Sequence, residues 1–380
     1  MDFELTENQR MMRDMTRDFA ARELAPIAQE MDEEGHLPDD VLTKMAGAGF
    51  FALSYPEKHG GLGLDTTSYG LVIEELSRQA AGVAIMAMVH NSVGCYPVAS
   101  FASEEVQAKV LPRMAAGELA GFCISEAGAG SDAAALRCNA RRDGDHYVLD
   151  GEKMWVTNGA RAAFYVVLAR TPGTTGHRDI HAFLVEAGQD GVTVAKKEDK
   201  LGLRASDTVV ISLEGVRVPE AHRLGDEGEG FKIAMQALDG GRIGVAFQAL
   251  GIARGCLDEA IGFARQREAF GATLADQPVI QHKLADMATE LDAGRLLALR
   301  AAWLKDSGRP FTREAAMAKL FATEAAGRIA DEALQIHGGY GYVKEYPVER
   351  YYRDVRITRI YEGASEIQRL VIARSLLREQ

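Results

Sequence analysis

Residues 208–266 read TVVISLEGVRVPEAHRLGDEGEGFKIAMQALDGGRIGVAFQALGIARGCLDEAIGFARQ, and the spacing of their apolar residues changes after Pro219. Before that proline the run is rich in β-branched residues, which is typical of a strand. From Phe231 onward the apolar residues recur at helical spacing and predict one long helix, although Gly240-Gly241 weakens that prediction. The stretch therefore joins the end of a β-domain to the start of a helical one.

The segments on either side of this junction extend both patterns. Towards the N-terminus lie further β-rich runs, AGFCIS, HYVLDGEKMWVT, FYVVLAR, IHAFLVE and VTVAKK, separated by turn signals such as Asp143-Gly144 and Asp150-Gly151. They predict a compact, largely antiparallel β-domain. Towards the C-terminus we expect helices that start near Pro278, cover residues 312–337 and start near residue 363.

The first 118 residues read as helices. Thr6 is a candidate N-cap three residues before Gln9, a spacing that suits a capping box. Helical periodicity follows at 39–50, 66–79, 82–92 and 103–116. The predicted fold class is therefore mainly α with a central β-domain. Three domains are expected, at residues 1–118 (helical), 119–224 (β) and 225–380 (helical bundle).

Composition excludes several classes of function. The chain has 380 residues, a net charge of -12 and a sequence pI near 5.3, without a dense Lys/Arg block, so we expect no binding to nucleic acid or to anionic membranes. No apolar run looks long enough to span a bilayer, and we expect no membrane insertion. The cysteines, which form no CxxC pair, are Cys95, Cys123, Cys138 and Cys256. They suit reduced packing residues of a cytoplasmic protein. The one metal-like histidine spacing, His177 and His181, lies in a Gly/Thr-rich stretch, so no metal site is expected.

Five segments carry residues that could form a site, and each also has an ordinary structural explanation. Residues 121–132, GFCISEAGAGSD, could offer donors to a ligand or be a flexible loop. Trp155 in GEKMWVTNG could pack beside a flat cofactor or in a core. Arg267 could grip a pyrophosphate or only meet a helix dipole. The glycines of QIHGGYGY, 335–342, could be a C-cap, and Glu362 in YEGASEIQR could be a charge at a helix entrance.

Taken together and in this order, six segments resemble the acyl-CoA dehydrogenase family. They are GFCISEAGAGSD, GEKMWVTNG, KLGLRASDT, RQREAFG, LQIHGGYGYVKEYPVERYYRD and YEGASEIQR. The resemblance covers essentially the whole chain, and from Gln335 onward it is greatest to the short-chain, butyryl-CoA dehydrogenase-like branch. It implies a helical N-terminal domain, a β-barrel-like middle domain and a C-terminal four-helix bundle. It also implies FAD, an acyl-CoA substrate, an electron-transferring flavoprotein as electron acceptor, and a homotetramer or dimer.

The same resemblance implies roles for the residues of the matching motifs. Glu362 would be the catalytic base, and Gly363 would lie beside the substrate thioester. The flavin would be lined by Phe122, Ile124, Ser125, Trp155 and Thr157. The adenine-diphosphate half of FAD would be held, from a neighbouring subunit, by Arg267, Phe270, Gln335, Gly338 and Gly339. Further cofactor candidates are Ser365, which could also cap the last helix, and Glu366. The CoA arm would meet Ser131, Asp239 and Arg242.

The implied reaction, α,β-dehydrogenation to the trans-2-enoyl-CoA, makes physical sense of a glutamate at position 362. A thioester α-proton is weakly acidic, so its removal needs a base on one face and stabilisation of the enolate oxygen. A hydride can then leave the β-carbon for flavin N5 on the opposite face. The resemblance gives the enolate oxygen to the backbone N–H of Glu362 and a ribityl hydroxyl of FAD. A glutamate buried between flavin and substrate would have a raised pKa. Some relatives carry the base at the position of Gly241, which cannot act here.

The chain departs from the family pattern at a few positions. Ala127, Ala364 and Pro278 replace a usual Pro, Thr and Gln, and Ser125 replaces a Thr but keeps the hydroxyl. These departures concern individual FAD contacts and not the reaction class. Whether Gln277 substitutes for the missing Gln stays open.

Other substrates and functions remain open from the sequence. A short branched-chain acyl group, isobutyryl or 2-methylbutyryl, is an alternative to a straight chain. Met86, Met88 and His90 are candidates for the floor of the acyl pocket, and His90 could equally be a packing histidine. An acyl-CoA oxidase is a second reading, although the chain is short for one. A non-catalytic, nucleic-acid-binding flavin relative is a third, against which Glu362 and the acidic charge argue.

Overall fold

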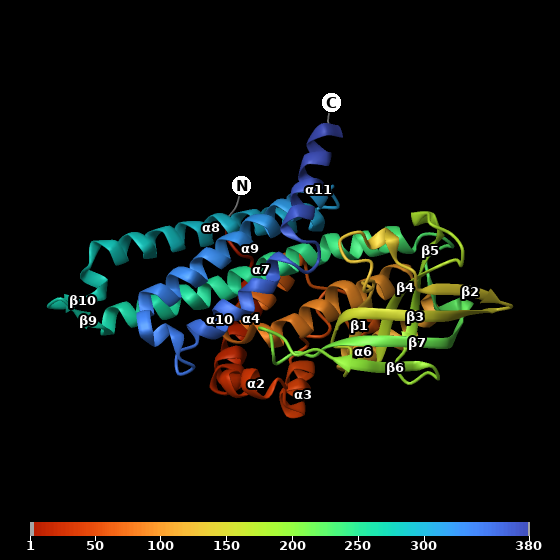
Figure 1. Cartoon of the computed structure of the whole chain (residues 1–380), viewed down its shortest axis with the longest axis horizontal. Helices are drawn as coiled ribbons and strands as arrows, with labels where there is room; N and C mark the ends of the chain where they lie inside the picture. Colours follow the sequence, from red (N-terminus) through yellow and green to blue (C-terminus); the bar gives the residue numbers. More distant parts are fainter. Residues whose placement is uncertain (1–3, 379–380) are drawn as a thin grey trace.

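The computed structural model describes residues 4–378 and has helices before and after a central sheet (Figure 1). The helices of the first part are α1 (Glu7–Phe19), α2 (Ala28–Glu34), α3 (Asp39–Gly47), α4 (Thr66–Val89), α5 (Tyr96–Phe101) and α6 (Glu104–Ala115). The predicted capping box is confirmed, because the Gln9 amide donates to Thr6 Oγ1 at 3.3 Å and Thr6 N donates to Gln9 Oε1 at 2.9 Å.

Helix α4 merges two segments that the sequence predicted separately. The predicted segments 66–79 and 82–92 meet at Ala80, whose backbone (φ -148°, ψ 82°) leaves the helical region and marks a kink. The prediction that no run is long enough to cross a bilayer was wrong, since Thr66–Phe101 is a 36-residue helical stretch with sufficient hydropathy. Of its apolar window 89% is buried within the structure, as expected of a core helix.

The sheet is mixed rather than simply antiparallel. Its strands are β1 (Ala120–Cys123), β2 (Asn139–Asp143), β3 (His146–Thr157), β4 (Phe164–Arg170), β5 (Ile180–Glu186), β6 (Val192–Lys197), β7 (Thr208–Pro219) and β8 (Arg223–Leu224). They follow the order β6-β7-β3-β2-β4-β5-β8, and β1 pairs with β4. Most neighbours are antiparallel as predicted, but β1 and β2 run parallel to β4. The sequence missed β2 because its sequence, NARRD, has no apolar alternation.

The C-terminal part is a bundle of long helices. They are α7 (Gly230–Gln266), α8 (Pro278–Asp306), α9 (Thr312–His337), α10 (Val348–Val355) and α11 (Ser365–Arg378). Gly240-Gly241 does not interrupt α7, because its core-facing side packs against α4 and α9. A short hairpin of β9 (Glu268–Ala269) and β10 (Ala272–Thr273) joins α7 to α8. The sequence missed α10, which is only eight residues long.

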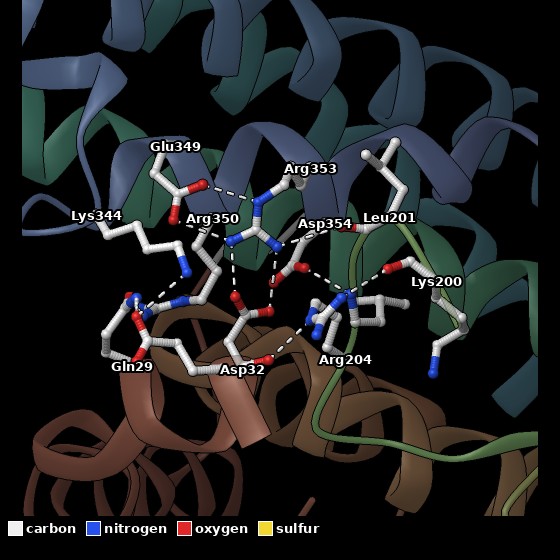
Figure 2. A network of polar contacts seen from close by, with 12 residues as sticks. Gln29, Asp32, Lys200, Leu201, Arg204, Lys344, Glu349, Arg350, Arg353 and Asp354 are labelled. Carbon is white, nitrogen blue, oxygen red and sulfur yellow. Dashed lines mark hydrogen bonds and ion pairs between the residues drawn. The ribbon is translucent and has the colours of Figure 1, made fainter. Parts of the chain in front are cut away.

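A buried ionic cluster ties the three parts together (Figure 2). Arg353 of α10 donates to Asp32 Oδ2 of α2 at 2.7 Å and to the Leu201 carbonyl oxygen at 3.2 Å. The neighbouring Asp354 accepts the Leu203 N–H at 2.6 Å, and burial raises its pKa to about 6. The cluster therefore fixes α10 against the N-terminal helices and the β-domain, and α10 leads directly towards Glu362. The domain boundaries predicted between residues 118 and 119 and between residues 224 and 225 stay predictions.

Candidate active site

Glu362 lies on a turn between a short 3₁₀-helix, Arg356–Arg359, and α11. Its φ is 51°, and that of Gly363 is 94°, so two consecutive residues occupy the left-handed region. Only glycine adopts this region freely, and a glutamate there carries strain that its surroundings must hold. Strained backbone of this kind concentrates at functional sites.

The carboxylate of Glu362 is removed from water although the residue as a whole is half-buried. Both carboxylate oxygens are buried and have no hydrogen-bond partner within residues 4–378. This burial raises the pKa of Glu362 to about 7, and the charges of Lys319 and Arg242 oppose the rise. A carboxylate with this pKa is a stronger base than an ordinary glutamate and still ionises near neutral pH.

Helix α7 runs directly beside the carboxylate, and glycines make this approach possible. A Cβ atom at Gly241 would collide with Glu362 Oε2. One turn on, a Cβ atom at Gly244 would lie 2.5 Å from the Tyr69 hydroxyl and 2.9 Å from Met88 Cγ. Position 241, where some relatives are expected to carry the base, thus lies against Glu362.

Of the five predicted flavin-lining residues, Phe122, Trp155 and Thr157 lie on strands of the sheet, and Ile124 and Ser125 directly follow β1. Phe122 and Ile124 are partly exposed on either side of the buried Cys123. Trp155 is 58% exposed and has a φ of 61° at an irregularity in the pairing of β3 with β7. The last two, Ser125 and Thr157, are also partly exposed. An exposed tryptophan on a strained backbone beside apolar side chains fits a flat aromatic ligand.

The residues predicted for the adenine-diphosphate half gather at the other end of the molecule. Arg267 follows α7, and its guanidinium lies 5.3 Å from the ring centre of Tyr340, beyond the end of α9. Phe270 at the tip of the hairpin is 98% exposed. Exposed at the end of α9 are Gln335, Gly338 and Gly339. Figure 1 shows this hairpin and the sheet at opposite ends of the long axis.

The predicted CoA contacts are spread over two regions. Ser131 is exposed in the loop after β1. On α7, Arg242 Nη1 donates to Asp239 Oδ1 at 2.5 Å, and Asp239 Oδ2 accepts from Thr312 at 2.6 Å. Arg242 Nε is buried without a partner within the described chain, which leaves a donor for a ligand.

The start of α11 differs from one expectation. The helix begins at Ser365, and the hydroxyl of this residue donates to Glu324 Oε1 at 2.7 Å. Ser365 is therefore not the N-cap, which would stand one residue earlier. Glu366 is exposed on the first turn. The predicted contacts of Ser365 and Glu366 with a cofactor stay predictions.

Sequence reasoning missed the groups that surround the turn. Lys319 on α9 is completely buried, and its ammonium donates to the Gly363 carbonyl oxygen at 2.8 Å. Gln368 on α11 donates to the same oxygen at 2.8 Å. The signal for Lys319 was present, because it shares a helical stripe with Ala315, Ala322 and Ala326, and a lysine among buried alanines is unusual.

Three family models match the chain in order. They describe the acyl-CoA dehydrogenase N-terminal domain at residues 6–118, middle domain at 121–216 and C-terminal domain at 228–377. The chain belongs to the acyl-CoA dehydrogenase family. This confirms the predicted family, fold class and enzyme class, a flavoprotein oxidoreductase that dehydrogenates acyl-CoA.

Several known proteins resemble the chain over its full length. The mitochondrial short-chain specific acyl-CoA dehydrogenase of Bos taurus is 50% identical over 376 residues, 99% of this chain and 91% of the relative. The structure of butyryl-CoA dehydrogenase from Megasphaera elsdenii is 42% identical with a TM-score of 0.98 and 100% coverage of both chains. A chain from the structure of the electron transferring flavoprotein of Acidaminococcus fermentans is 44% identical, with the same TM-score and coverage.

A substitution at Gly241 tests its close approach to Glu362. Gly241→Ala places a methyl group where Glu362 Oε2 lies, so the carboxylate must move. A misplaced base loses much of its contribution, and we expect acyl-CoA dehydrogenation to fall about tenfold or more. Gly262→Ala in the same helix has open space around the added methyl and is the matched control. Equal turnover of the two variants, measured with a dye acceptor, would contradict the contact.

Proposed function

We propose that this acyl-CoA dehydrogenase converts a short-chain acyl-CoA to the trans-2-enoyl-CoA, with Glu362 removing the α-proton. One observation carries the proposal: both Glu362 oxygens are buried on a strained turn and have no hydrogen-bond partner among residues 4–378. Leaving a buried carboxylate without partners costs free energy. That cost is understandable if the carboxylate must receive a proton during the reaction.

The residues of the chain supply the proton-transfer half of the reaction. The Cα–H bond of the thioester breaks, its proton goes to a Glu362 oxygen, and its electron pair delocalises onto the thioester oxygen as an enolate. When bound, FAD supplies the acceptor for the hydride that then leaves the β-carbon. Arg242 and Lys319 favour the ionised form of Glu362, which is the form that accepts the proton.

FAD fits the two exposed sets of residues only if a second copy of the chain completes each site. Trp155 and its neighbours would pack against the flavin ring, and Arg267 would pair with the diphosphate. The two sets stand at opposite ends of one chain, which supports a site shared between subunits of a homotetramer or dimer. The exposure of Phe270 at the hairpin tip supports the same assembly.

The short-chain proposal draws on the relatives and on the packing beside Glu362. The Bos taurus relative is short-chain specific, and the Megasphaera elsdenii relative acts on butyryl-CoA. Tyr69 and Met88 are buried next to Gly244 and would limit the depth of an acyl pocket there. His90 is a packing histidine, since its Nδ1 accepts from Ala120 N at 3.0 Å and its Nε2 lies 3.1 Å from the Phe51 carbonyl oxygen.

The similar chain from Acidaminococcus fermentans supports an electron-transferring flavoprotein as electron acceptor.

Glu362→Gln tests the base. Glutamine is nearly isosteric but cannot accept the proton, so turnover should fall roughly 10²–10⁴-fold while FAD and acyl-CoA still bind. In the unmodified enzyme, kcat/KM should rise as the pH passes about 7, because the ionised form of Glu362 is the active one. Turnover of the variant within a factor of about three of the original would exclude Glu362 as the base.

A turnover survey tests the substrate. Each methylene buried in a fitting apolar pocket contributes about 0.8 kcal/mol, and carbons beyond the floor force repacking at about 1–3 kcal/mol. We expect kcat/KM to peak near C4–C6 in a series from C4 to C16. Isobutyryl-, 2-methylbutyryl- and glutaryl-CoA complete the survey and separate straight from branched and acidic substrates. An optimum at C10 or longer would reject a short pocket and leave the reaction class intact.

Arg267→Ala tests the shared cofactor site. Loss of a charge-assisted contact to phosphate costs about 1.5–3 kcal/mol, so FAD affinity should fall about tenfold to a hundredfold. Arg265→Ala, an exposed arginine in the last turn of α7, is the matched control. FAD retention is measured on the purified proteins, together with their size by light scattering. If both variants keep FAD equally well, Arg267 is not a cofactor residue.

A further inference from the structure

Lys319 is a completely buried lysine whose ammonium meets the turn that carries the base. It stands in the middle of α9, and its hydrogen bond goes to the neutral Gly363 carbonyl oxygen at 2.8 Å. Burying an ammonium costs several kcal/mol unless nearby charges compensate for the loss of water. A methionine would fill similar space at no such cost, so the charge itself needs an explanation.

We propose that Lys319 is a positioning residue for Glu362: it anchors the Glu362–Gly363 turn and supplies the positive charge that keeps the base ionised. The inference rests on the proposed function, in which Glu362 takes the α-proton. It adds to that function the reason why a buried carboxylate can stay ready to accept a proton.

The hydrogen bonds around the Glu362–Gly363 turn indicate how Lys319 anchors it. The turn holds two successive left-handed residues and needs contacts that prevent relaxation. Lys319 reaches the Gly363 oxygen from α9, and Gln368 Nε2 reaches it from α11 at 2.8 Å. Gln368 also lies 3.4 Å from the Glu362 carbonyl oxygen. One carbonyl thus receives a charged and a neutral donor from two helices, which allows the two effects to be separated.

The charged and titratable groups around the turn indicate how Lys319 affects the protonation of Glu362. Burial raises the pKa of Glu362 to about 7, while Lys319 of α9 and Arg242 of α7 lower it. Burial lowers the pKa of Lys319 to about 8, although Glu362, Glu324 and Glu366 raise it, and Arg242 lowers it further. The tyrosines that feel the Glu362 charge, Tyr69 of α4 and Tyr361, have pKa values raised by burial and stay neutral.

These directions define a window of pH. The Lys319 charge is present below about pH 8 and is lost above it. Its help to Glu362 is therefore larger near pH 7 than near pH 9. A residue that only filled space would act equally at every pH.

The test compares three variants across this window. Lys319→Met removes donor and charge, Lys319→Gln keeps a donor but removes the charge, and Gln368→Met removes the neutral donor only. For Lys319→Gln we expect kcat/KM to fall about tenfold at pH 7 and to approach the unmodified enzyme at pH 9. Lys319→Met should show the same trend on top of a uniform loss, and Gln368→Met a uniform loss alone. A loss that does not change with pH in both Lys319 variants would overturn the proposal, as would failure of both to fold with flavin.

A second measurement isolates the proton transfer. In 3-thiabutyryl-CoA a sulfur replaces the β-carbon, so no β-hydride can leave and only the α-proton can be removed. Its exchange for deuterium in D2O, followed by NMR, should show the same pH trend in the Lys319 variants. Glu362→Gln separates the two proposals: if it exchanges normally, the base assignment fails. If it does not exchange but the Lys319 variants behave like the unmodified enzyme at pH 7, only the role of Lys319 fails.

Discussion

A carboxylate held out of water, with no hydrogen-bond partner in the described part of the chain, is the constraint on which the rest of the site depends. Such a group tends to escape to solvent or take up a proton. The chain prevents the first by fixing Glu362 on a turn anchored from α9 and α11. It limits the second through Arg242 and Lys319. The bare backbone of α7 at Gly241 then leaves the carboxylate the space that it needs.

Most helices and strands of the fold could be predicted from local sequence patterns. Helices α8 and α9 begin at Pro278 and Thr312 as predicted, because a proline start and a strong apolar stripe are local signals. Strand β2 and helix α10 were missed, since their stability comes from neighbouring strands and from buried ion pairs rather than from their own sequence. The parallel pairing of β1 with β4 depends on contacts between residues 44 positions apart, which periodicity does not report.

The candidate site also has features that the sequence predicts and features that only the folded chain reveals. Glu362 stands just before α11, as its sequence predicted, and its role as the base, which the family resemblance implies, stays a proposal. Three features appear only once the chain is folded: the strain at Trp155, the buried Arg242 Nε that has no partner among the residues described, and the hydrogen bond from Lys319. They involve residues that lie far apart in sequence. Only the hydrogen bond from Lys319 had a sign in the sequence, which is a lysine within a stripe of buried alanines.

The ionic cluster of Figure 2 has a consequence for how such chains diverge. Asp32, Arg353 and the backbone of residues 201–203 come from three separate parts of the sequence, yet each satisfies a polar group of another. At residues 201 and 203 the β-domain contributes only backbone atoms, which the β-domain of a relative would also supply, whereas a change of Asp32 or of Arg353 alone would break the ion pair between α2 and α10. Positions 32 and 353, which are 321 residues apart in the sequence, are therefore constrained as a pair, and a chimaera that takes them from two different parents can lose this contact.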